Sequence, residues 1–149
     1  SCSGYLDSKV TKADTLNTKF YKKWDEIEKK YSDGCDDIKI LKDSAGYFLT
    51  APYYLIPQHK NERVWIKNNN QFLVNPRGPF EGYFILYDNH NLKAKKNFIE
   101  KSKNVSQVDY SMTVISCYKT WLKVSLKYKG KTYVGWTKDF CPLGCTTCT

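Results

Sequence analysis

The stretch WLKVSLKYKGKTYVGW, residues 121–136, decides the fold class of this chain. Side chains of alternating polarity flank the dipeptide Lys129-Gly130, which is the pattern of a β-hairpin with a two-residue turn. The alternating positions are Leu122, Val124, Leu126 and Tyr128 before the turn, and Thr132, Val134 and Trp136 after it. One face of the hairpin is therefore expected to be buried. Because a lone two-stranded ribbon is only marginally stable, the pattern predicts further strands that cover this face.

From Ile38 onward, the chain shows sequence patterns typical of strands, as the hairpin does. Short runs of aromatic and β-branched residues are broken by Gly, Pro and Asn, which is typical of an antiparallel sheet. We predict further strands at Gly46–Tyr54, Arg63–Ile66, Gln71–Val74, Gly82–Tyr87 and Met112–Cys117. Tight turns are predicted over 75–79 and 88–91, and the lysine-rich stretch 92–103 is predicted to be a short helix or a long loop.

One helix is predicted near the start of the chain, over residues 11–31. Its apolar residues recur at steps of four, four, three and four, which places them on one helical face. These residues are Leu16, Phe20, Trp24, Ile27 and Tyr31. We expect this face to pack on the body of the same domain.

The six cysteines indicate the cellular compartment. They are Cys2, Cys35, Cys117, Cys141, Cys145 and Cys148. So many cysteines in a short chain favour disulfides outside the cytoplasm, although sequence does not choose among the fifteen pairings of six cysteines. We favour an arrangement in which disulfides to Cys117 and Cys35 link the C-terminal tail to the body of the domain. Cys2, flanked by small residues, is also a candidate for lipidation, which would leave an odd number of cysteines and provide a membrane tether.

Neither a metal nor a cofactor is expected. The C-terminal cluster supplies only three close cysteines, whereas a structural zinc site needs four ligands. Catalysis is not expected either, because His59 and His90 lie in no recognisable catalytic motif and no nucleotide-binding or hydrolase motif occurs.

The net charge of +9 predicts affinity for an anionic partner. Lysines crowd the last hairpin, where Trp121, Tyr133 and Trp136 are interleaved with them. Such a surface suits ring stacking on sugars or bases together with capture of carboxylates or phosphates. In the opposing interpretation, Trp136 fills the core and the lysines only line a solvated face. By alternation Trp121 faces away from Val124, so its ring lies at a barrel end or on a binding surface.

Several of these motifs resemble the C-terminal half of bacterial SH3 domains. They are Thr113-Val114-Ile115, Trp121-Leu122-Lys123-Val124, Gly130-Lys131 and Gly135-Trp136-Thr137, and the stretch 47–55 is similar to the opening strand of that family. Together with the predicted helix and the cysteines, the resemblance implies a mainly β fold with an N-terminal helix, namely a small, disulfide-stapled, SH3-like antiparallel β-barrel with an elaborated insertion. We divide the chain into the N-terminal helix region (1–45), the barrel (46–140, with its insertion at about 63–110) and a Cys-rich tail (141–149).

The resemblance and the composition together predict a non-catalytic, extracytoplasmic binding module. It would be periplasmic or secreted, and its partner would be cell-wall peptide or glycan, such as a peptidoglycan fragment, or a protein. An exported chain rarely meets nucleic acid, so none is expected as a partner. The candidate binding residues are Tyr53, Tyr54, Trp121, Lys123, Tyr133 and Trp136. The alternative function is a secreted or periplasmic inhibitor or immunity protein that blocks the active site of another protein.

Overall fold

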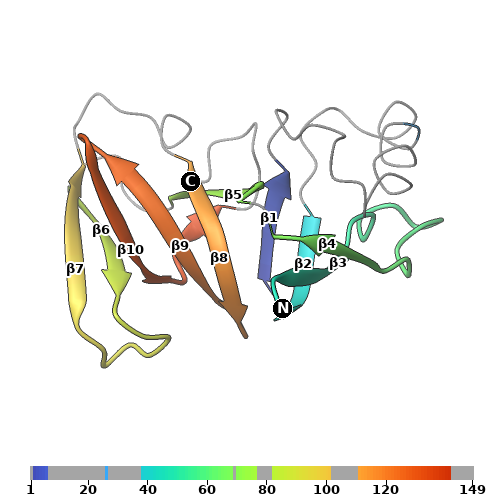
Figure 1. The fold of residues 1–149 in the computed structure, drawn as a ribbon, viewed down its shortest axis with the longest axis horizontal. Helices are drawn as coiled ribbons and strands as arrows, with labels where there is room; N and C mark the ends of the chain where they lie inside the picture. Colours follow the sequence, from blue (N-terminus) through green and yellow to red (C-terminus); the bar gives the residue numbers. More distant parts are fainter. Residues whose placement is uncertain are drawn as a thin grey trace.

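The computed structural model describes residues 2–6, 26, 38–68, 70–76, 82–101 and 111–141. These residues form an eleven-stranded sheet in which every strand pair is antiparallel (Figure 1). The strands are β1 (Cys2–Leu6), β2 (Ile38–Ser44), β3 (Tyr47–Ala51), β4 (Val64–Lys67), β5 (Phe72–Pro76), β6 (Gly82–Tyr87), β7 (Lys96–Lys101), β8 (Met112–Tyr118), β9 (Trp121–Tyr128), β10 (Lys131–Thr137) and β11 (Phe140–Cys141). Their order is β4-β3-β2-β1-β5-β8-β9-β10-β6-β7, and β11 pairs with β5.

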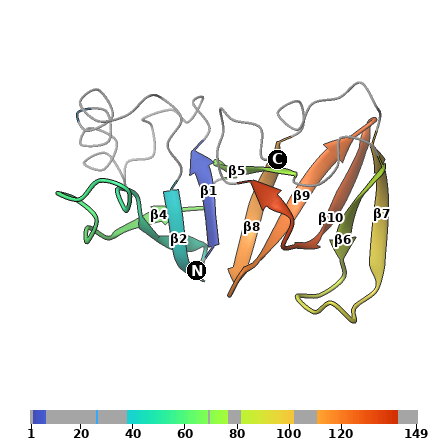
Figure 2. The same cartoon turned by 180° about the vertical axis from the view of Figure 1, so that it is seen from behind.

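The sheet has two halves joined by β5. Strands β1 to β4 make one half and strands β6 to β10 make the other, and β5 lies between them in both views (Figures 1 and 2). Leu73 of β5 pairs with Tyr5 of β1 and with Thr113 of β8. Because a residue in a sheet has only two neighbouring strands, β1 and β8 must lie on opposite edges of β5.

A single hydrophobic core lies against the inner faces of both halves. Its buried members come from nearly every strand and include Ile38, Ile40, Phe48, Ile66, Phe72, Val74, Phe84, Leu86, Ile99, Met112, Val114, Leu122, Val124 and Leu126. Phe48 of β3 meets Phe72 of β5 edge to face, with ring centroids 5.1 Å apart. Burial of this apolar surface is the main force that holds the two halves together.

The hairpin β9–β10 buries one face, as expected. The residues of β10 that we grouped with the inward-facing residues of β9, however, point outward. The two-residue turn pairs Tyr128 with Lys131, so Leu126 faces Tyr133 and Lys123 faces Trp136. Thr132, Val134 and Trp136 therefore share the outer face with Lys123, while Leu122, Val124 and Leu126 point into the core. The geometry of the turn decides this register.

The predicted SH3-like barrel is wrong. The hairpin belongs to an open sheet whose terminal strands are β4 and β7, so the described strands do not close into a small barrel. The region 63–110, expected as an insertion, contributes β4 to β7 to the same sheet. The helix expected over 11–31 lies outside the described residues apart from the exposed Glu26, and every element that the structure defines is a strand.

The expectation of a disulfide-stapled fold is corrected as well. Cys117 and Cys141 are the two cysteines whose side chains are described, and no disulfide links them to one another, although each is disulfide-bonded. Backbone pairing and the shared core join the described strands. Within the described ranges, no helix is long and apolar enough to cross a membrane.

Gly135 marks the point where β10 meets β6. A Cβ atom at this position would lie 2.9 Å from Leu86 Cβ and 3.0 Å from the carbonyl oxygen of Tyr87. These contacts are too short for an ordinary side chain, and one of the atoms belongs to the backbone. Only glycine therefore allows the pairing of Trp136 with Tyr87, the register pair that joins the two strands.

We expect Gly135→Ala to lower the free energy of unfolding by about 1–3 kcal/mol, because the added methyl group overpacks this contact. Chemical denaturation followed by circular dichroism measures the change. Ser125→Ala, on the outer face of the neighbouring strand, is the control and should stay within about 0.5 kcal/mol of wild type. Equal stability of the Gly135→Ala variant and wild type would show that β10 and β6 are not closely packed.

Candidate functional site

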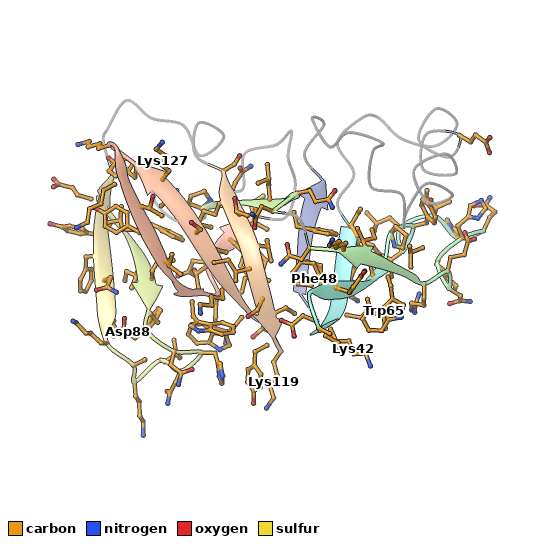
Figure 3. The ribbon with its side chains drawn as sticks, viewed as in Figure 1. Lys42, Phe48, Trp65, Asp88, Lys119 and Lys127 are labelled. Atoms are coloured by element: carbon orange, nitrogen blue, oxygen red, sulfur yellow. The ribbon has the colours of Figure 1, made fainter. Side chains whose placement is uncertain are left out.

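A cleft of about 550 Å³ opens between the loop that connects β6 to β7 and the turn that connects β8 to β9. It is lined by residues 89–93 of the loop, residues 118–121 around the turn, and Lys138 just after β10. Lys119, which lines the cleft, and Asp88, which precedes the lining residues of the loop, are labelled in the lower part of Figure 3.

The loop that forms one wall of the cleft is held in shape by its own hydrogen bonds. Asp88 N donates to the carbonyl oxygen of Lys95 at 3.0 Å and closes the loop. Side-chain oxygens of two asparagines accept backbone N–H groups inside it, Asn89 from His90 at 2.8 Å and Asn91 from Lys93 at 2.9 Å. Such asparagine turns stabilise a tight backbone path without secondary structure.

The rings of His90, Tyr118 and Trp121 line the cleft, and they contact further rings outside its lining. His90 stacks on Tyr118 with centroids 3.8 Å apart and an interplanar angle of 24°, and it meets the edge of Trp136 at 5.0 Å. Trp121, only 6% exposed, meets Tyr87 edge to face at 5.3 Å. Offset and edge-to-face contacts of this kind stabilise aromatic pairs beyond simple burial. The rings therefore make a rigid surface across three strands and the loop.

Lysine ammonium groups lie close to these rings. Lys138 Nζ is 5.5 Å from the centroid of Trp121, and Lys119 Nζ is 5.5 Å from that of Tyr118. Lys93 also lines the cleft, and no acidic residue does so within the described part of the chain. Cation–π attraction holds an ammonium group near a ring while its other donors stay available to a ligand. The cleft therefore combines aromatic surface with positive charge.

Three of the residues predicted to bind come together on the outer face of the last hairpin. Lys123 lies opposite Trp136 in the ladder, and Trp121 follows on the same side of β9. The opposing interpretation, in which Trp136 fills the core, is not supported, since Trp136 is only partly buried and belongs to the outer face. Tyr133 lies on the inner side instead, partly buried against the core, with Lys131 Nζ 5.1 Å from its ring.

The other two predicted residues, Tyr53 and Tyr54, belong to the opposite half of the sheet, in the loop after β3. Tyr53 is buried in the core, and Tyr54 is partly buried with Lys39 Nζ 5.7 Å from its ring. They take no part in the cleft.

Of the residues that line the cleft, only Trp121 was among the predicted binding residues; those missed include His90, Leu92 and Tyr118. The sequence carries a weak signal for one of them, since His90 lies inside a predicted turn between two asparagines. The contact of this turn with the β8–β9 turn depends on the pairing of β6 with β10, which no local pattern indicates.

A second polar cluster lies beside Tyr53. His59 Nδ1 and Glu62 Oε2 are 2.7 Å apart, and the His59 ring meets Tyr53 at 5.9 Å. Successive backbone hydrogen bonds, Ile56 to Tyr53, His59 to Ile56 and Glu62 to His59, wind this loop into consecutive turns. Burial, and to a lesser extent the charge of Glu62, raise the pKa of Tyr53 far above its ordinary value. The cluster braces the loop between β3 and β4.

We expect Tyr53→Phe to reduce the loss of stability at alkaline pH. The pKa of Tyr53 is raised in the folded state, so the folded protein favours the protonated phenol. The stability that this contributes is complete below the unfolded pKa of about 10 and falls as the pH rises above it. Denaturant unfolding between about pH 8 and 11 should show a shallower decline for the variant. Tyr83→Phe, which removes an exposed hydroxyl, is the matched control, and equal declines for Tyr53→Phe and wild type would contradict the effect.

No metal-ligating cluster of three or more side chains occurs in the described ranges. No family model matches the chain, and no curated protein or solved structure was found to be similar to it. The likeness to bacterial SH3 domains is therefore confirmed by none of these comparisons, and the function has to be argued from the cleft itself.

Proposed function

We propose that this protein is a non-catalytic binding module whose cleft binds an acidic saccharide, with a peptidoglycan fragment as the natural candidate. The observation that supports the proposal best is the convergence of aromatic rings and lysines on one cleft. A sugar ring presents an apolar face that packs on aromatic side chains. Its carboxylates would accept charge-assisted hydrogen bonds from the ammonium groups at the margins of the rings.

The rigidity of the cleft favours binding. Asparagine turns hold one wall, and the β8–β9 hairpin turn holds the other. The His90 ring is held between Tyr118 and the edge of Trp136, so it acts as part of the lining. A site that is already formed loses little conformational entropy when it binds.

The chemistry of the lining also favours binding over reaction. Two-carboxylate glycoside hydrolysis and thiol nucleophile chemistry each need a carboxylate or a cysteine at the site. Neither residue type lines the cleft within the described part of the chain. The net charge of +9 adds long-range attraction toward a polyanionic wall, an effect that added salt weakens.

We expect Tyr118→Ala to weaken binding of a soluble muramyl-peptide disaccharide by about 1–3 kcal/mol, as measured by isothermal titration calorimetry. The fold should persist, because Tyr118 is 43% exposed at the end of β8. Trp65→Ala is the matched control, since Trp65 is 44% exposed on β4 in the other half of the sheet. Equal losses in both variants, or no binding by wild-type protein, would overturn the proposal.

One observation favours the alternative of an inhibitor. Leu92 is 61% exposed on the braced loop and lines the cleft, so it could enter the pocket of a partner protein. Leu92→Ala would then weaken a stoichiometric complex with one protein more than it weakens binding of the muramyl-peptide disaccharide. If this chain co-purifies with a single protein and does not bind purified peptidoglycan, the inhibitor alternative is favoured over wall binding.

A further inference from the structure

Among the described strands, β7 is a terminal strand of the sheet, and its outer face has an unusual pattern of side chains. Of these strands it pairs only with β6. Its outer face carries Lys96, Phe98 and Glu100, all exposed, while Ile99 points into the core. Unpaired edges of this kind are templates for pairing with another strand.

We propose that two copies of this chain associate through β7, as antiparallel neighbours about a two-fold axis that passes beside Phe98. The interface is then isologous, with the same strand contributed by each copy. It is separate from the proposed function, because it requires no ligand in the cleft.

The register of this pairing follows from the sequence of β7. Residues that face one another across an antiparallel pair lie on the same side of the sheet. With Phe98 opposite its own copy, Lys96 of each chain faces Glu100 of the other. Two attractive pairs thus form around one aromatic contact. A shift of two residues in either direction places Phe98 opposite a charged residue and loses both pairs.

Exposed aromatic surface beside the edge supports the same partner. Phe98 is 58% exposed and Tyr83 of β6 is 57% exposed, and their rings meet edge to face at 5.7 Å. Pairing through β7 brings the two copies of this aromatic pair together across the axis. Burial of their exposed parts stabilises the dimer in proportion to the apolar area removed from water.

The opposite edge of the sheet carries a charge pattern that opposes self-pairing. Strand β4 is also terminal, and its outer face carries Trp65 and Lys67, with Arg63 just before the strand. Self-pairing centred on Trp65 would place Arg63 opposite Lys67 at both ends. Like charges directly opposite one another are destabilising, and natural proteins use them to protect sheet edges. The two edges therefore differ in charge pattern, and only β7 complements itself.

Two repulsive terms oppose the dimer. Lys95 and Lys101 come opposite one another at the ends of the pair, and each chain carries a net charge of +9. At a physiological ionic strength of about 0.15 M the screening length is about 8 Å. The distant charges are then largely screened, while facing side chains at about 5 Å still interact.

The dimer is tested by sedimentation velocity of the full chain from low micromolar to near-millimolar concentration at that ionic strength. We expect a reversible monomer–dimer equilibrium for wild type. Lys96→Glu should weaken association roughly tenfold, because both facing pairs become repulsive. Glu100→Lys should do the same, and the double variant Lys96→Glu with Glu100→Lys should recover most of the wild-type affinity.

Lys127→Glu is the control with the same change of charge, on an exposed position of β9 that the interface does not include. It should associate at least as well as wild type. Circular dichroism confirms that each variant folds, which matters because Lys96 also lies over the Tyr87 ring at 5.7 Å. A wild-type chain that stays monomeric throughout, or a double variant that fails to recover, would overturn the proposal. Weakening by Lys127→Glu equal to that by Lys96→Glu would overturn it as well.

Discussion

The pairing of β5 on both of its edges is the constraint on which the rest of the structure depends. Leu73 pairs with β1 on one side and with β8 on the other, and the end of the strand also pairs with β11. The approach is close enough that a Cβ on Gly4 of β1 would lie 2.9 Å from the carbonyl oxygen of Leu73. Because β5 belongs to both halves, their inner faces share one core instead of folding as separate units.

The candidate site depends on a second, narrower junction. β10 and β6 are joined through the register pair Trp136 and Tyr87, next to the close contact at Gly135. This junction brings the β6–β7 loop against the β8–β9 turn, and the cleft is the space between them. His90 spans the gap, stacking on Tyr118 and meeting Trp136. Fold and site are thus linked through a few residues of a single strand.

Local pattern predicted much of the sheet. The strands at Gly82–Tyr87 and Trp121–Tyr128 are confirmed at their predicted bounds, and the other predicted strands differ at their ends. Strands β1, β2, β7 and β11 were missed. β7 has the sequence KNFIEK, whose two apolar residues are adjacent and show no alternation, and β1 is short and rich in small residues. The predicted topology was wrong because short local motifs do not determine which distant strands pair.

The site was predicted only in part for the same reason. The pairing of Lys123 with Trp136 follows from the two-residue turn alone, since that turn fixes every later pair in the hairpin. Counting outward from the turn would have placed Trp136 on the outer face. The contacts of His90 and Tyr87 depend on the junction of β10 with β6, which is non-local. Tyr53 was predicted to bind a ligand but lies in the core. An aromatic residue that follows a strand can lie in the core or on the surface, and the local sequence does not distinguish the two.

The most direct measurement of the central claim is a two-dimensional ¹H–¹⁵N spectrum of the tryptophan indole groups during titration with a muramyl-peptide disaccharide. The chain has four tryptophans, so single Trp→Phe variants assign the signals. If the cleft binds the saccharide, the Trp121 and Trp136 signals shift together and saturate at one ligand concentration, while the Trp65 signal stays in place. Shifts at Trp65 without shifts at Trp121 and Trp136, or no shifts at any of the three, would contradict the account.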